Sequence, residues 1–152
     1  MEVHESTRLL REFTRVSDDF QLHLASELAV NTTDLQAMQH LIQRGAMSPT
    51  EIARALQVST AAATVVVDRL VRVGHVTREP HPTDRRAVVV SPSPESVMAA
   101  MSALTPMIQG IDRVIKDFSE SERDTITEYL RRIVDVYRQS VPEEMRTSSR
   151  GA

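Results

Sequence analysis

The sequence contains no cysteine among its 152 residues. This absence excludes disulfide bonds, thiolate metal ligands and thiol-based redox switches within the chain. Glycine is also scarce, with four residues, and the sequence has neither a glycine-rich phosphate loop nor a nucleophile elbow. The five histidines form no pair at metal-ligand spacing on one predicted helix. We therefore expect no metal, no cofactor and no enzymatic activity.

Long apolar segments are missing as well. No run approaches the roughly 18 apolar residues of a membrane-spanning helix, and Met1–Glu5 is acidic where a signal peptide is basic. We expect a soluble, cytoplasmic protein with no membrane partner. The length suits one domain with its own core and room for a dimerising extension.

The charges are unevenly distributed although the formal net charge is only -3. Residues 52–90 carry six basic and three acidic side chains, so this stretch has a charge of +3 and the remainder has -6. All but one of the 18 cations are arginine, whose guanidinium forms bidentate contacts with phosphate or carboxylate. The middle of the chain is therefore the part with the charge to approach nucleic acid.

Periodicity and capping residues predict four helices in the first half of the chain. The first covers residues 3–28, and the second begins near Leu35, is capped by the last residues of the polar segment 31–34, and ends near Gly45. A third runs to about Leu56 from the capping box Ser48-Pro49-Thr50-Glu51. The fourth spans Thr60–Val73, with Ser59 as its cap and Gly74 at its end.

The third and fourth helices are joined by a short turn, which is the spacing of a helix-turn-helix. Short β-type runs then follow, at Val76 to Arg78 and Ala87 to Val90, separated by the basic, proline-bearing segment 80–86. This pattern predicts a β-hairpin whose tip stands away from the core as a wing.

Two long helices complete the chain. The first begins at Ser93-Pro94 and carries an apolar stripe with the 3.5-residue period of a seam between packed helices: Val97, Met101, Leu104, Ile108, Ile111, Ile115 and Phe118. The second begins at a capping box, Ser119 to Glu122, and is predicted to turn one apolar face inward: Ile126, Leu130, Ile133, Val134 and Tyr137. We expect residues 143–152 to be a flexible tail.

The fourth helix is the candidate recognition helix. Its predicted core residues repeat at helical spacing: Ala63, Val66, Val67, Leu70 and Val73. The outer face is then Thr60, Ala61, Thr64, Val65 and Asp68. These short side chains can touch thymine methyl groups or donate single hydroxyl bonds, but they cannot make bidentate contacts with guanine. The alternative is a helix that only packs within a module that binds no DNA.

The wing tip carries the stronger candidates for function. Arg85 and Arg86 on a stiffened loop can enter a minor groove, whose negative potential attracts guanidinium groups. We expect Asp84 to pair with a neighbouring arginine and fix the loop. The alternative is a solvated surface cluster of charges. Candidates for phosphate contact are Arg54, Thr60, Arg69 and Arg72.

The order of these elements and four motifs resemble the MarR family of winged-helix transcriptional regulators. The motifs are Leu56-Gln57-Val58-Ser59, Val67-Asp68-Arg69-Leu70, Gly74-His75-Val76-Thr77-Arg78 and Asp84-Arg85-Arg86-Ala87. The sequence departs from the family at Val65, where a polar or basic residue is common, and at Val90-Ser91-Pro92-Ser93-Pro94, which replaces the usual Leu-Thr and glycine.

The resemblance implies a mainly α fold with a small β-hairpin wing, in which N- and C-terminal dimerisation helices flank a winged helix-turn-helix. Residues 1–30 and 94–142 are then the dimerisation region, and residues 34–92 are the DNA-binding domain. The predicted contacts with double-stranded DNA come from Ser59, Thr60, Ala61, Thr64, Val65, Arg69, Arg72, Arg85 and Arg86, with Asp84 shaping the wing.

The function implied by the resemblance is that of a homodimeric, ligand-responsive repressor, which binds an inverted-repeat operator and responds to a small-molecule effector. The effector rests on the resemblance alone. The alternative is a dimeric winged-helix module that binds a protein partner and no DNA. The acidic net charge and the short, mostly apolar side chains on the outer face of the fourth helix favour that alternative.

Overall fold

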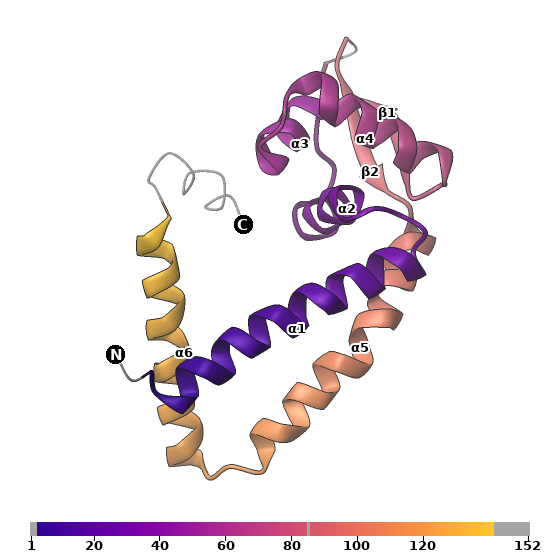
Figure 1. Ribbon diagram of the computed structural model, residues 1–152. Helices are drawn as coiled ribbons and strands as arrows, with labels where there is room; N and C mark the ends of the chain where they lie inside the picture. The colour runs from indigo at the N-terminus through magenta and orange to yellow at the C-terminus, as the bar shows by residue number, and fades with distance from the viewer. Residues whose placement is uncertain (1–2, 85, 142–152) are drawn as a thin grey trace. The chain divides into compact units, whose positions relative to one another are not determined.

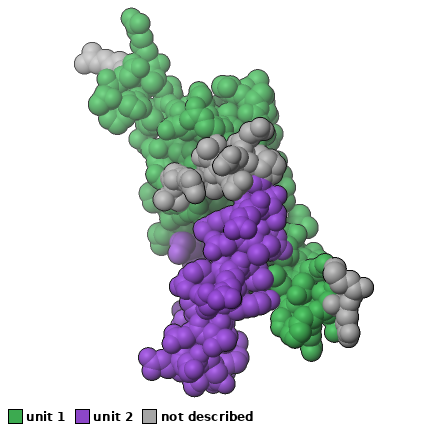
Figure 2. Space-filling model, turned by 90° about the vertical axis from the view of Figure 1, so that its left-hand side faces the viewer, with its two compact units in different colours: residues 1–100 green, residues 101–152 purple. Residues whose placement is uncertain are grey.

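A computed structural model describes residues 3–84 and 86–141 of the chain. These residues form a mainly helical fold with one two-stranded antiparallel hairpin (Figure 1). The chain divides into two compact units, residues 1–100 and 101–152, which Figure 2 distinguishes by colour. The elements are α1 (Glu5–Glu27), α2 (Thr32–Arg44), α3 (Pro49–Leu56), α4 (Thr60–Arg72), β1 (Val76–Pro80), β2 (Val88–Pro92), α5 (Pro94–Lys116) and α6 (Glu120–Ser140).

Capping side chains decide where α2 and α3 begin. The predicted capping box of α3 is confirmed, because Ser48 Oγ accepts the Glu51 N–H at 3.2 Å and the Glu51 carboxylate accepts the Ser48 N–H at 2.7 Å. The backbone bond from Ser48 is the main reason that the pKa of Glu51 is lowered. The predicted start of α2 near Leu35 is wrong. Asn31, the first polar residue of the segment, is the cap, since its side chain accepts the Asp34 N–H at 2.8 Å.

Glycines end two helices by adopting positive φ angles. Gly45 follows α2 with φ +82°, and Gly74 lies after α4 with φ +79°. A residue without Cβ adopts this conformation at no steric cost, whereas other residues are strained in it. Both predicted helix ends are therefore confirmed to within two residues.

The hairpin pairs Val76 with Pro92 at one end and Pro80 with Val88 at the other. Both strands extend two residues further along the chain than the predicted runs, to Pro80 and Pro92. The segment before α3 adds a β-bridge, in which Met47 N–H donates to Val90 O at 3.0 Å and Val90 N–H donates to Met47 O at 2.7 Å. These bonds attach the hairpin to the start of the helix-turn-helix.

The core of residues 1–100 lies where α2, α3, α4 and the hairpin meet. Its largest fully buried side chains are Leu24, Met38, Leu41, Ile52, Val67, Leu70, Val76 and Val90. The predicted inner face of α4 is buried at four of its five positions, but Val73 is 50% exposed. Because α4 ends at Arg72, Val73 lies in the turn to β1 instead of on the inner face.

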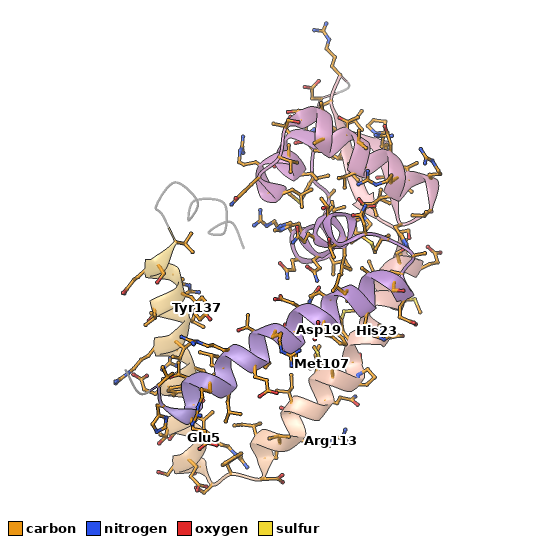
Figure 3. The ribbon with its side chains drawn as sticks, in the orientation of Figure 1. Glu5, Asp19, His23, Met107, Arg113 and Tyr137 are labelled. Atoms are coloured by element: carbon orange, nitrogen blue, oxygen red, sulfur yellow. The ribbon has the colours of Figure 1, made fainter. Side chains whose placement is uncertain are left out.

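Residues 101–141 contain most of α5 and all of α6, and α6 has no buried residue. The predicted capping box of α6 is confirmed by reciprocal bonds between Ser119 and Glu122. Large apolar side chains of this unit are exposed, including Met107 and Tyr137, which Figure 3 labels. The others are Met101, Ile108, Ile111, Val114, Phe118, Tyr129, Leu130, Val134, Val136 and Val141.

Within the described ranges, no helix is both long enough and apolar enough to cross a membrane. The tail expected at 143–152 lies outside the described residues.

Candidate nucleic-acid interface

The first two turns of α4 form an exposed surface on a helix that is packed against its neighbours. Ser59 Oγ accepts the Ala62 N–H at 3.1 Å, which starts the helix. The opposite side of α4 packs against α2, α3 and β1, and Figure 1 shows the hairpin behind it. The predicted outer residues are all exposed: Thr60, Ala61, Thr64, Val65 and Asp68. The structure therefore brings the predicted base-contacting side chains onto one solvent-facing helix surface.

The hydroxyl of Thr64 is already engaged within the helix. It donates to the Thr60 carbonyl at 2.9 Å, the bond by which threonine satisfies itself inside a helix. Its only hydrogen is therefore directed back along α4. What Thr64 presents outward is a methyl group and an acceptor oxygen.

Arg69 forms a two-point ion pair with Asp34 at the start of α2. Its Nε lies 3.0 Å from Asp34 Oδ2 and its Nη2 lies 2.6 Å from Oδ1. The Asp34 side chain is 5% exposed and the Arg69 side chain is 38% exposed. The hydrogen bond to Asp34 is the main reason that the pKa of Arg69 is raised. The guanidinium proposed to contact phosphate thus has a partner inside the protein, and it anchors α4 to α2.

Asp68 and Arg78 form a second ion pair, which joins α4 to β1. Both side chains are partly exposed. The pair lies between α4 and the first strand of the hairpin, so it sets these two elements relative to each other. Arg72, the third charged side chain of α4, is exposed as well.

The wing loop is shaped by backbone bonds to Asp84. Its Oδ1 accepts the Arg86 N–H at 2.9 Å, and its carbonyl accepts the Ala87 N–H at 3.0 Å. The side-chain bond to the Arg86 N–H has the form of an Asx-turn, and the expected pairing of Asp84 with an arginine side chain stays a prediction. Arg86 is exposed, and Arg85 lies outside the described residues.

His75 joins three segments of the chain, a role that the sequence did not predict. Its Nε2 lies 2.7 Å from the Leu28 carbonyl and its Nδ1 lies 2.7 Å from Ser96 Oγ. Ser93 Oγ donates to Ser96 Oγ at 2.7 Å, and Ser93 N–H donates to the His75 carbonyl at 2.8 Å. A neutral imidazole that carries its proton on Nε2 satisfies every one of these contacts. The ring thus connects the end of α1, the turn after α4 and the start of α5.

A hollow of about 410 Å³ lies between α1 and α2. Its lining combines the amides of Gln21, Gln36 and Gln39 with the carboxylate of Asp18 and two leucines, Leu22 and Leu35. Gln39 Nε2 donates to Gln21 Oε1 at 2.8 Å. Its volume lies within the range of small-molecule sites, although such sites are usually lined by more apolar side chains. Among the residues described, no three histidine, aspartate or glutamate side chains are grouped to hold a metal ion.

Comparison with known proteins identifies the family. The MarR family model matches residues 30–88, which run from the residue before the cap of α2 to the first residue of β2. The uncharacterized HTH-type transcriptional regulator Mb0904 of Mycobacterium bovis is 31% identical over 97 residues, 64% of this chain and 68% of that protein. The chain belongs to the MarR family. The uncharacterized HTH-type transcriptional regulator YcgE of Bacillus subtilis is 29% identical over 117 residues, 77% of this chain and 76% of that protein.

Solved structures share the fold of this MarR-family chain. RV1404 from Mycobacterium tuberculosis superposes with a TM-score of 0.71 at 20% identity, over 89% of this chain and 95% of that one. A mutant of S. aureus MepR bound to oligodeoxyribonucleotide superposes with a TM-score of 0.64 at 14% identity, over 89% and 99%. The predicted fold class, a winged helix-turn-helix with flanking helices, is confirmed.

Proposed function

We propose that this MarR-family chain is a sequence-specific DNA-binding transcriptional regulator. The observation that carries the proposal is the exposed first half of α4, a helix whose second half is held by ion pairs to α2 and β1. A rigid, solvent-facing helix of this kind fits the major groove. The names of the relatives, which are transcriptional regulators, and the oligonucleotide in the MepR structure support the same proposal.

In this proposal α4 lies in the major groove and the wing reaches the adjacent minor groove. Ser59, Thr60, Ala61, Thr64 and Val65 are near the bases. Arg72 approaches phosphate, and Arg85 and Arg86 supply the wing with cationic groups suited to a narrow minor groove. The +3 charge of residues 52–90 supports this orientation, since the rest of the chain is acidic and repels the duplex.

The protein acts as a homodimer on an inverted repeat. The support is the apolar surface of the long helices, where Phe13 on α1, Ile111 on α5 and Val136 on α6 are each more than half exposed. Monomeric proteins in water rarely leave large apolar patches uncovered. A two-fold dimer presents two recognition helices to two half-sites. Sedimentation of the full chain at micromolar concentration should show a dimer, and a folded 17.0 kDa monomer would refute this part.

Repression and a small-molecule effector are the remaining parts of the proposal. One relative, YetL of Bacillus subtilis, is named as a transcriptional repressor and is 30% identical over 84 residues. The α1–α2 hollow is the proposed effector site. An effector releases DNA only if it binds the DNA-free conformation more tightly. A compound that raises the melting temperature should therefore weaken DNA binding, and Gln36→Leu should reduce both effects.

Selection of duplexes from a random library by the purified chain tests the proposed function. Enrichment of an inverted repeat is the expected result. A flat profile would favour the second candidate, a dimeric winged-helix module that binds a protein partner and no DNA. The apolar surface of Ala61 and Val65 on α4 is the observation that favours this alternative.

A further inference from the structure

The outer face of α4 has few polar groups with which to contact a base. Asp68 and Arg69 are held in ion pairs with Arg78 and Asp34, and the Thr64 hydrogen is donated to the Thr60 carbonyl. A bidentate contact with guanine or adenine requires a long side chain with two aligned donors or acceptors. The first half of α4 therefore lacks the groups for the usual hydrogen-bonded readout.

Apart from Thr60, the outer positions that remain carry apolar groups. Ala61 and Val65 are four residues apart on α4, so they lie one above the other on the same face, with about 5–6 Å between their Cβ atoms. Val65 is 52% exposed, and Ala61 is exposed. Neighbouring bases of one DNA strand are about 3.4 Å apart along the helix axis, so the two side chains can reach bases one or two steps apart.

The major groove presents one apolar group in unmodified DNA, the 5-methyl of thymine. We infer that Ala61 and Val65 recognise thymine methyl groups, so that apolar contact sets the base preference of α4. This inference rests on the proposed DNA binding and specifies what the recognition helix selects. Each methyl removed from water against Val65 or Ala61 strengthens binding by about fourfold, since burial of one such carbon contributes about 0.8 kcal/mol.

A uracil scan tests the inference directly. A duplex enriched from the random library by the full-length protein is resynthesised with deoxyuridine in place of each thymidine in turn, which removes only the 5-methyl group. We expect about fourfold weaker binding at one or two positions in each half-site and no change elsewhere. Replacing guanine by 7-deazaguanine, which removes the N7 acceptor, should leave the affinity unchanged.

Paired variants connect the effect to the residue. Val65→Ser removes both methyl groups of the side chain, and Val73→Ser makes the same change at a position that is also half exposed, beyond the end of α4. Val65→Ser should bind the thymine and uracil duplexes with nearly equal affinity at one position of each half-site. Val73→Ser should retain the full difference.

The outcomes separate this inference from the proposed function. If the unsubstituted duplex binds well and no uracil substitution lowers the affinity, the proposed DNA binding is supported and the inference of methyl recognition is wrong. If 7-deazaguanine causes the larger loss, α4 reads hydrogen bonds and the inference is again wrong. If the library yields no bound duplex, both fail.

Discussion

Replacing Arg69 with methionine separates a positioning role from a phosphate contact. Methionine retains a long, helix-forming side chain but removes the charge, so the Asp34 carboxylate, which is 5% exposed, loses its partner. Removing one member of a fully buried pair costs about 3–5 kcal/mol. Because the Arg69 side chain is 38% exposed, we expect a smaller value of about 2–3 kcal/mol. The melting temperature should then fall by about 4–12 °C.

Urea unfolding at a fixed protein concentration measures this cost, since the stability of a dimer depends on concentration. The double variant with Asp34→Asn should be more stable than the sum of the two single changes predicts, by about 1–2 kcal/mol, because the residues interact directly. The dependence of DNA binding on salt provides the second readout. Each lost phosphate contact lowers the slope by about 0.9, and Arg69→Met should leave the slope unchanged.

Arg72→Met is the matched control on the same helix. Arg72 is exposed and is proposed to contact phosphate, so its replacement should barely change stability and should lower the salt slope by about 0.9 for each chain. The reasoning is refuted if Arg69→Met has the same free energy of unfolding as the unmodified chain and yet reduces the salt dependence of DNA binding. Arg69 would then be a phosphate contact, and its ion pair with Asp34 would not stabilise the fold.

Three further changes have defined outcomes. The double change Arg85→Ala and Arg86→Ala should weaken DNA binding in a titration while the melting temperature stays within about 2 °C, and the reverse pattern would make the pair a structural clamp. Burial, and then the charge of Arg44, lower the pKa of His40 from its ordinary value of 6.5. The neutral imidazole therefore stabilises the fold above pH 6.5. This contribution is lost as the pH falls through the lowered pKa of the folded state. His40→Gln should flatten the stability profile on that acid side, and an unchanged profile would contradict the assignment. Gly74→Ala should lower the free energy of unfolding in urea by about 1–2 kcal/mol, because alanine is strained at a φ of +79°. Steric contact adds nothing to this cost, since no atom lies within 4 Å of the added Cβ. An unchanged stability would show that the backbone of this turn relaxes.

Local signals in the sequence predicted the elements well. The Ser48 and Ser119 capping boxes and the terminal Gly45 depend on residues close to one another in the chain, and the structure confirms all three. The start of α2 was misplaced because Asn31, Thr32 and their neighbours are all polar, so composition alone does not choose the cap. Only the geometry of the Asn31 side chain does so.

Contacts between distant residues were not predictable in the same way. Asp34 and Arg69 are 35 positions apart, and His75 is 47 positions from Leu28. No periodicity relates such pairs, because the three-dimensional packing of α2 against α4 and of α1 against the turn brings them together. The DNA-contacting roles of Arg72, Arg85 and Arg86 stay predictions, as does the assignment of residues 1–30 and 94–142 to dimerisation.

The imidazole of His75 also has a consequence for hydrogen exchange. One ring bridges the Leu28 carbonyl and Ser96, while the backbone of His75 donates to Leu70 and accepts from Ser93. Opening any of these segments removes a bond from the others, so they form one cooperative unit. The amide hydrogens of His75 and Ser93 should therefore exchange with solvent at matched free energies of opening, although they belong to different parts of the chain.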